Sequence, residues 1–282
     1  MPPRPRYDLS PEDFVVVDGF ATPPAAKYRP FHALISSIKL ILNKDDTRQV
    51  FEAVTALSRD SARRLFQRFI ATPYGRRVIT EPVEIETILG DFPRLRAMAP
   101  GTVGRSYVDF MDEAGFTPQG LIDAAEEAGV GMKEFPELKE FARAFRHLEV
   151  NHDLWHVLTG YGRDPLGEIC NLVFTQAQTR NPGLKLIIRM GLAALKLERW
   201  SFPALKAAAE ARRMGEAVDF LLQHDVEAML EQPLADMRAR LGVFKPETYD
   251  AIPHAVKHSV LRPKVKKTQT EREDERGVPQ AA

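Results

Sequence analysis

Apolar residues recur at intervals of three and four along most of this chain, which is the period of a helix and not of a strand. An apolar stripe predicts a helix over Phe31–Leu42, a second helix capped by Asp46 follows, and a third carries Leu65 to Ile70. Further helices are predicted over 104–114, 118–128, 136–159, 165–180, 183–198, 203–230 and 233–241. Val15–Val17 is the only strand-like run, and one isolated strand gives no sheet. The pattern predicts an all-α fold, a single multi-helix domain.

The two ends of the chain differ from this helical middle. Residues 1–29 read as a Pro-rich N-terminal arm and residues 30–255 as the helical domain. Residues 256–282 read as a disordered charged tail, because they offer too little apolar surface to offset the cost of ordering. Basic residues at its start favour either a solvated tail or contact with an anionic membrane surface.

The helix predicted over 136–159 carries two histidines on its apolar seam. His152 continues the stripe of Phe141, Phe145 and Leu148, and His156 follows four residues later on the same face. An inward-facing imidazole needs a partner for its ring nitrogens, since an unpaired buried polar group costs about 1–3 kcal/mol. One metal ion would satisfy both rings. Asp153 lies to the side, where it can join the ligands or orient an imidazole.

A short turn then brings a carboxylate back toward the histidines. Gly160 to Asp164 read as the turn, with Asp164 as N-cap and Pro165 as the first residue of the next helix. Glu168 stands near the start of that helix, and the fold-back places it close to His156. The sequence therefore predicts a metal-binding helix hairpin with His152, Asp153, His156 and Glu168 as candidate ligands.

Simpler interpretations stay open for each of these residues. The two histidines are also consistent with an ordinary packed pair, Asp153 with a solvated position, and Glu168 with a carboxylate that complements the positive end of a helix dipole. A nitrogen and oxygen donor set suits a divalent metal, zinc first, with iron, manganese or cobalt fitting the same set. The aspartate inside the pair makes a zinc protease motif a poor match, because that motif has glutamate there.

The same residues carry a resemblance to a known family. His152-Asp153-Leu154-Trp155-His156, followed after eleven residues by Glu168, resembles the signature of the Coq-four family of coenzyme Q (ubiquinone) biosynthesis proteins, in a bacterial-type form. Weaker matches are the segments 72–76, 100–105 and 233–238, so the resemblance covers about residues 65–245. Glu149 stands where the family pattern implies an arginine, and Arg146 is the candidate for that basic role.

The resemblance implies a role in ubiquinone biosynthesis. The implied step is metal-dependent removal of the C1 carboxyl from a polyprenylated ring derived from 4-hydroxybenzoate, alone or coupled to hydroxylation of that carbon, as in a decarboxylase-type lyase. His152, Asp153, His156 and Glu168 would be both catalytic and metal-binding residues. The alternative is a non-catalytic lipid-binding scaffold that organises other ubiquinone-biosynthesis proteins at the membrane. A His-Asp phosphohydrolase is a third class, but it needs a further distant histidine and aspartate.

Charge and cysteine content bear on the protein's partners and on the compartment in which we expect it. The chain has 39 basic and 39 acidic residues, so it has no overall attraction for nucleic acid. Its single cysteine, Cys170, excludes an internal disulfide and reads as a buried structural thiol. The first residues lack the character of a secretion signal or a mitochondrial presequence. We therefore expect a cytoplasmic protein, peripheral to the inner face of a bacterial inner membrane, as a monomer or a homodimer.

Two further segments have more than one interpretation. Leu184–Leu197 is apolar but is interrupted by charges, so it predicts no membrane span. It could pack in the core, line a tunnel for an isoprenoid tail, or rest on a membrane. His224-Asp225-Val226-Glu227 lies on the helix predicted over 203–230, where it could be a charged surface, a second metal site, or outer support for the first metal site.

Overall fold

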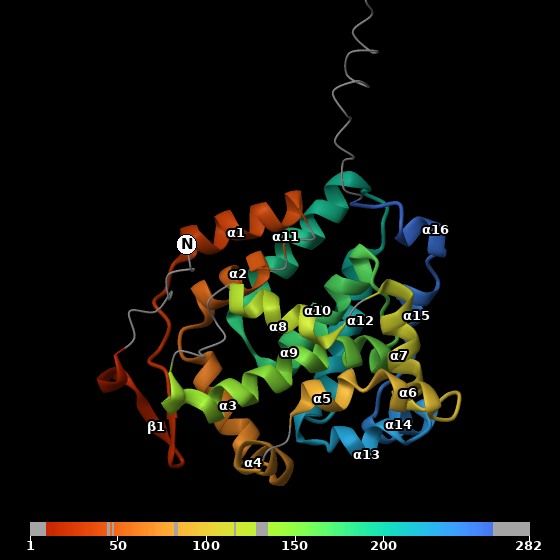
Figure 1. The fold of residues 1–282 in the computed structure, drawn as a ribbon. Helices are drawn as coiled ribbons and strands as arrows, with labels where there is room; N and C mark the ends of the chain where they lie inside the picture. The colour runs from red at the N-terminus through yellow and green to blue at the C-terminus, as the bar shows by residue number, and fades with distance from the viewer. Residues whose placement is uncertain are drawn as a thin grey trace, which may run out of the picture.

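The computed structural model confirms a single helical domain (Figure 1). It describes residues 10–43, 46, 48–81, 84–115, 117–127 and 135–261. The α-helices of the first half are α1 (Pro30–Leu42), α2 (Arg48–Ser58), α3 (Ser61–Ile70), α4 (Pro73–Thr80), α5 (Ile85–Gly90), α6 (Phe92–Ala97), α7 (Val103–Ala114) and α8 (Pro118–Glu127). Those of the second half are α9 (Lys139–Thr159), α10 (Pro165–Thr179), α11 (Pro182–Glu198), α12 (Ala204–Ala217), α13 (Val226–Leu230), α14 (Leu234–Leu241), α15 (Glu247–Asp250) and α16 (His254–Lys257).

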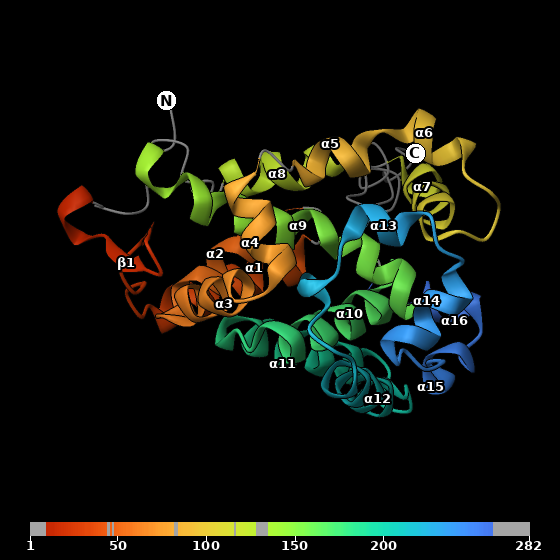
Figure 2. The same ribbon diagram turned by 90° about the horizontal axis from the view of Figure 1, so that it is seen from below.

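The long helix α9 is the centre of the domain. It packs against α3, α4, α5, α7, α8, α10 and α14. Seen from below, it lies between a layer containing α5 and α8 and a layer containing α10 and α12 (Figure 2). Its last two turns are almost wholly buried, with Leu154 and Trp155 among the largest core side chains. Because neighbours surround these turns, the histidines that they carry sit inside the domain.

The N-terminal segment contains a β-hairpin where a lone strand was expected. Strand β1 (Val15–Val17) pairs antiparallel with β2 (Phe20–Thr22), and a short 3-10 helix, η1 (Pro11–Asp13), precedes them. Asp18 and Gly19 form the connecting turn with φ angles of 50° and 88°. A two-residue turn with both φ values positive matches the right-handed twist of the strands, and Asp-Gly is a preferred sequence for it. The expectation of an isolated strand was wrong, because the Asp18-Gly19 turn folds the chain back and lets Phe20–Thr22 pair with the first strand.

The long helix expected over 203–230 is broken into three elements. Helix α12 ends at Ala217, a 3-10 turn η3 (Leu221–Gln223) follows, and α13 begins at Val226. Gln178 of α10 stabilises the break, since its amide donates to the carbonyls of Gly215 and Val218 at 2.8 and 3.1 Å and accepts from the Leu221 N–H at 3.0 Å. Those backbone groups would otherwise lose their helical partners in a buried place. A side chain from elsewhere in the chain therefore decides where the helix stops.

The segment predicted over 136–159 begins as a 3-10 turn, η2 (Pro136–Leu138), and continues as α9. Short helices such as α4, α5 and α6 were not predicted, because so few residues show little periodicity. No helix in the described ranges is both long enough and apolar enough to cross a membrane. Residues 262–282, and with them most of the expected charged tail, lie outside the described residues.

Candidate metal centre

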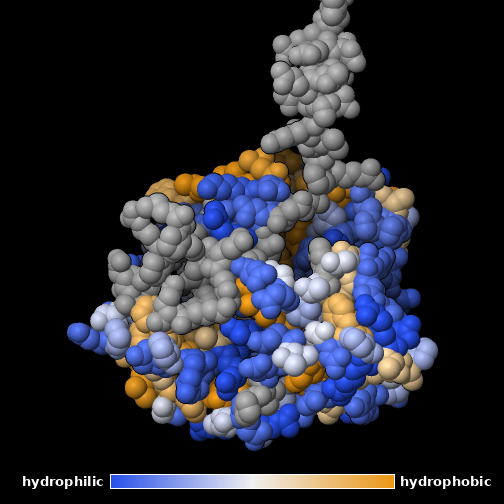
Figure 3. All heavy atoms as spheres, in the orientation of Figure 1, coloured by the Kyte–Doolittle hydropathy of each residue, from blue (hydrophilic) through white to orange (hydrophobic). Residues whose placement is uncertain are grey.

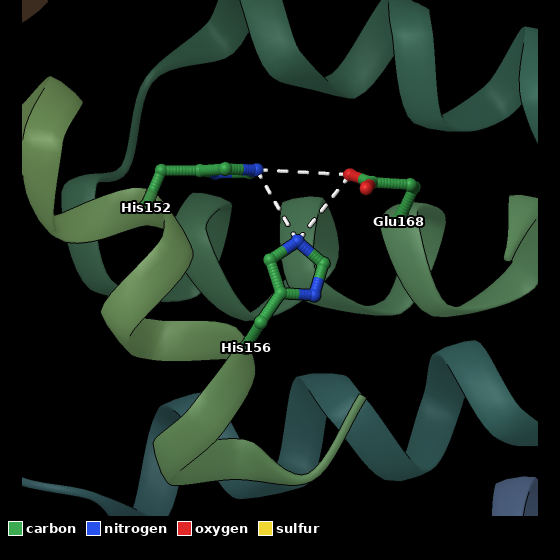
Figure 4. Close-up of side chains that lie close together, drawn as sticks. All are labelled: His152, His156 and Glu168. Atoms are coloured by element: carbon green, nitrogen blue, oxygen red, sulfur yellow. Dashed lines mark hydrogen bonds and ion pairs between the residues drawn. The ribbon is translucent and has the colours of Figure 1, made fainter. Parts of the chain in front are cut away.

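Two neighbouring helices bring His152, His156 and Glu168 together (Figure 4). The Nε2 atoms of the two histidines are 3.3 Å apart. Oε2 of Glu168 lies 3.6 Å from Nε2 of His152 and 3.4 Å from Nε2 of His156. Three donor atoms held about 2.0–2.1 Å from one tetrahedral ion would be separated by about 3.3 Å. The spacing of this donor set therefore fits one metal ion at the centre of the triangle.

The hairpin turn forms as the sequence predicts. Gly160 ends α9 in the left-handed conformation, with φ of 82°, and Asp164 is the N-cap of α10. The Asp164 carboxylate accepts from the N–H groups of Leu166 and Gly167 at 3.2 and 3.1 Å. Gly167 packs so closely on the backbone of Gly162 that any Cβ there would overlap it. This close approach sets the position of Glu168, the next residue.

The imidazole of His156 is held in one tautomer. Its Nδ1 is 2.9 Å from the carbonyl oxygen of Tyr161, which can only accept, so Nδ1 carries the proton. Nε2 points into the cluster, where it donates to Glu168 when it is protonated and offers its lone pair to a metal ion when it is not. Phe110 of α7 stacks on one face of the His156 ring, with 5.5 Å between the ring centroids. A backbone carbonyl that orients a ligating histidine is a common outer support of metal sites.

Asp153 does not join the cluster. It is buried, and its Oδ1 forms an ion pair with Nη1 of Arg163 at 3.3 Å. The Arg163 guanidinium also lies over the Phe110 ring, 4.1 Å from its centroid, and Phe110 in turn stacks on His156. Asp153 is therefore connected to the site through Arg163 and Phe110, and its charge also acts on His152. The structure places three of the four predicted ligands together and assigns the fourth to a supporting ion pair.

The charges of the cluster stabilise one another. Burial by itself would raise the pKa of Glu168, but the charge of His156 and hydrogen bonds from both imidazoles outweigh it and leave that pKa below its usual range. Burial by itself would lower the pKa of His152, but the hydrogen bond and charge of Glu168, with a contribution from Asp153, raise it overall. The carboxylate is therefore ionised, as a metal ligand must be.

Solvent can reach one side of the cluster. The side chains of His152 and Glu168 are 24% and 40% exposed, whereas that of His156 is fully buried. Three protein donors with an accessible edge are typical of a catalytic metal site, which keeps a coordination position for water or substrate. A structural site is instead usually closed by four protein ligands.

Several supporting residues were not identified from the sequence. Asn171, one turn after Glu168, has its amide 3.5 Å from Nδ1 of His152 and donates to the His152 carbonyl at 3.2 Å. Asn171 follows Glu168 by three residues, so both lie on one face of α10. That spacing could have suggested that Asn171 also faces the histidines. Nothing in the local sequence points to Tyr249, whose hydroxyl donates to Asp164 and accepts from the Gly162 N–H at 2.9 Å.

Other predicted positions have separate roles. Asp225 caps α13 and pairs with Arg77 at 2.9 Å, so the cluster of His224 to Glu227 is not part of the described metal centre. Arg146, the candidate for the basic role, pairs with Glu86 at 2.8 Å. Cys170 is a buried free thiol, as expected. Arg163 is the arginine that contacts Phe110 and Asp153 beside the cluster, whereas Arg146 pairs with Glu86.

Comparison with known proteins agrees with the fold and the family resemblance. A family model described as "Coenzyme Q (ubiquinone) biosynthesis protein Coq4" matches residues 23–247. A crystal structure of a proposed ubiquinone biosynthesis protein from Nostoc punctiforme superimposes with a TM-score of 0.56, covers 77% of this chain and 99% of that protein, and is 19% identical in sequence. That similarity supports the fold alone.

Curated relatives are similar over a shorter range. The mitochondrial ubiquinone biosynthesis protein of Ajellomyces capsulatus is 30% identical over 185 residues, which are 65% of this chain and 62% of the relative. Its homologue from Danio rerio is 28% identical over 183 residues, 65% of this chain and 64% of the relative. The chain thus spans less than two thirds of these relatives. Because they are named as mitochondrial proteins, the expected bacterial cytoplasmic location is contradicted and is not retained.

Proposed function

This chain belongs to the Coq4 family of coenzyme Q (ubiquinone) biosynthesis proteins, and from that membership we propose that it removes the C1 carboxyl of a polyprenylated ring derived from 4-hydroxybenzoate. The observation that carries the proposal is the accessible triangle of His152, His156 and Glu168. We assign to it one divalent metal ion, zinc first, with iron, manganese or cobalt compatible with the same donors. The ring intermediate and other proteins of ubiquinone biosynthesis would be its partners.

The chemistry follows from charge. A cation bound at the cluster would hold the substrate carboxylate or phenolate and stabilise the negative charge that develops as carbon dioxide leaves. The carbon–carbon bond breaks with its electron pair left on the ring, and a proton from solvent replaces the carboxyl. Solvent has a path to this point along the exposed parts of His152 and Glu168. Coupled hydroxylation would additionally require molecular oxygen and either a redox-active metal or another electron acceptor, since zinc has no redox chemistry of its own.

The chain's own residues would position the reaction. The Tyr161 carbonyl fixes the proton of His156 on Nδ1, so Nε2 faces the ion. Phe110 stacks on the His156 ring, and Arg163 packs over Phe110. Asp153 in turn forms an ion pair with Arg163. The isoprenoid tail would follow an apolar groove along α11, whose Gly191 lies against Ile169, the residue after Glu168. Such a groove stays a prediction.

A scaffold is the second candidate. In this alternative the metal only pins the hairpin, and the protein holds a lipid intermediate while it docks partner proteins at a membrane. The observation that favours it is the row of exposed apolar side chains on α1, which includes Phe31, Ile35 and Leu42. A large exposed apolar patch is typical of an interaction surface.

Substitution of Glu168 by glutamine separates the two candidates. It preserves size but removes the charge that holds the ion. In a ubiquinone-producing host that lacks this protein, the wild type should restore ubiquinone, while Glu168→Gln should fold and yet leave a prenylated precursor that still bears its carboxyl, as measured by mass spectrometry. Glu137→Gln, at an exposed position before α9, is the matched control and should behave as wild type. Normal ubiquinone with a folded, metal-free Glu168→Gln protein would contradict catalysis and favour the scaffold.

A further inference from the structure

A second pair of histidines lies outside the metal centre. His254 begins α16 and His258 directly follows it, and the His258 N–H closes the helical turn by donating to the His254 carbonyl at 3.1 Å. The two rings are in contact, with 4.0 Å between their centroids and 34° between their planes. Both residues are exposed, and hydrophilic side chains cover much of the side of the molecule where α16 lies in Figure 1 (Figure 3). The spacing of four thus places two imidazoles on one side of a single turn, open to solvent.

Two histidines placed in this way can chelate a metal ion. The same spacing on one helix face supplies two of the ligands in known zinc sites. Imidazole nitrogen is a donor that suits zinc, copper and nickel. The rings of His254 and His258 now lie against each other, so chelation requires that they rotate until one nitrogen of each faces the same point. Exposed side chains change rotamer within picoseconds to nanoseconds, so both rings can make this rotation.

The pair differs from the first centre in the number of ligands that the chain supplies. Within the described ranges, His152, His156 and Glu168 are the one group of three or more candidate ligands, so α16 supplies two imidazoles and water completes the shell. An ion with two exposed protein ligands exchanges readily and is lost on dialysis, whereas the first centre keeps its ion. Affinity should rise from manganese through nickel to copper. Magnesium, which prefers oxygen ligands, should not bind.

Helix α16 also contacts the residue that clamps the turn of the first centre. Nζ of Lys257, which lies between the two histidines in the chain, is 3.8 Å from the centroid of the Tyr249 ring. Tyr249 in turn donates to Asp164 and accepts from the Gly162 N–H. A helix of four residues has little stability of its own, because few hydrogen bonds offset the cost of forming its first turn. An ion held by both histidines binds only the folded turn, so it would stabilise that turn and the position of Lys257 on Tyr249.

We infer that His254 and His258 form a second, exchangeable site for a divalent ion of the copper, nickel or zinc class, and that an ion bound there braces the segment that clamps the turn of the first centre. The spacing and contact of the two rings support the site. The contacts that run from Lys257 through Tyr249 to Gly162 support the bracing. Neither part depends on decarboxylation, so the site goes beyond the proposed function and is tested separately from it.

Isothermal titration with nickel tests the site. Full-length protein without a histidine tag that carries His152→Ala and His156→Ala lacks the imidazoles of the first centre. It should bind one nickel ion per chain and give no binding heat with magnesium. Adding His254→Ala should weaken nickel binding by at least about tenfold, because a single imidazole loses the advantage of chelation. Adding His224→Ala instead removes one histidine elsewhere, so it is the matched control and should leave nickel affinity unchanged. Equal nickel affinity with and without His254→Ala would overturn the site.

Equilibrium dialysis of the wild-type chain gives a second measurement that leaves the first centre intact, and it decides the question if the double alanine background does not fold. Protein loaded with zinc and then dialysed should take up one nickel ion per chain while its zinc content stays constant. The His258→Ala protein should keep its zinc and lose most of the nickel uptake. Nickel uptake that is the same in both proteins would contradict the assignment to α16.

Hydrogen exchange of the zinc-loaded wild type, read by mass spectrometry, tests the bracing. Nickel should slow exchange in the peptides that cover residues 254–258 and 160–164, and it should change neither peptide in the His258→Ala protein. Slowing confined to residues 254–258 would leave the site in place and refute the bracing. No slowing in either peptide at saturating nickel would overturn both parts. A Glu168→Gln protein that restores ubiquinone would refute only the decarboxylase proposal, because neither nickel measurement depends on that reaction.

Discussion

Tyr249 on α15 donates a hydrogen bond to Asp164, the residue that caps α10 on the far side of the metal-binding turn. The same hydroxyl accepts from the Gly162 N–H at 2.9 Å. One side chain near the C-terminal end of the domain therefore holds the middle and the end of the turn that carries Glu168 into place. The site depends on a contact between residues 85 positions apart.

We predict that Tyr249→Phe weakens metal binding without changing any ligand. Loss of the hydroxyl leaves the buried Asp164 carboxylate with fewer donors and lets the turn relax, and loss of such an outer support typically costs 10- to 100-fold in metal affinity. Competition with a chelator would measure the change. Tyr161→Phe is the control: its buried hydroxyl has no hydrogen-bond partner in the described structure, so affinity should be unchanged. Equal affinity of both variants would contradict this role for Tyr249.

Metal content should depend on the two histidines together. We expect the purified protein to contain one divalent ion per chain and the combined His152→Ala and His156→Ala variant to contain none, because Glu168 alone cannot hold the ion. Elemental analysis of the dialysed proteins gives the ratio directly. His224→Ala, which changes a histidine outside the cluster, should retain the metal. A double variant that keeps its full metal content would exclude this centre.

The pair of Asp153 and Arg163 should contribute to stability. Arg163→Met leaves the Asp153 carboxylate buried without its cation, and breaking a buried ion pair in this way costs about 3–5 kcal/mol. Adding Asp153→Asn should recover part of the loss, because the uncompensated charge disappears. Urea unfolding of the single and double variants measures both values. Additive losses would show that the two residues do not act as a pair.

His147 should make stability depend on pH. Its ring is fully buried between Phe69 and Tyr74, and burial lowers its pKa to about 3 from an ordinary value near 6.5. The unfolded chain therefore binds a proton below pH 6.5, whereas the folded chain stays neutral until about pH 3. Stability is full above pH 6.5 and falls by up to about 1.4 kcal/mol per pH unit as the pH drops through this window.

Replacement by phenylalanine isolates this contribution. His147→Phe keeps an aromatic ring in the site but cannot be protonated, so its unfolding free energy should fall less steeply with pH than that of the wild type. Chemical denaturation at several pH values between 6.5 and 4 compares the two slopes. Identical slopes for wild type and His147→Phe would show that the buried ring is not the titrating group.

Local chemistry was sufficient to predict the core of the site. Spacing of four places His152 and His156 on one helix face, and Asp164 followed by Pro165 starts the next helix, as observed. The expected return of Glu168 is also confirmed by its 3.4 Å distance from His156. Each of these features depends on residues close together in the chain. For that reason, helix periodicity and capping rules could predict them.

Tertiary contacts decided the features that local rules could not predict. Within the hairpin, side-chain packing pairs Asp153 with Arg163 of the turn, and Asp153 therefore lies outside the donor cluster. Helix α12 stops because Gln178 of α10 occupies the groups at the break. The stripe on α1 is apolar in sequence, but only its packing on α2 through Ser36 shows that the stripe faces outward. The sequence by itself determined the helices, their caps and the histidine pair, because these follow from bonds and spacings within a few turns. The tertiary structure decided which polar groups meet and which apolar face stays uncovered, because both depend on neighbours supplied from distant parts of the chain.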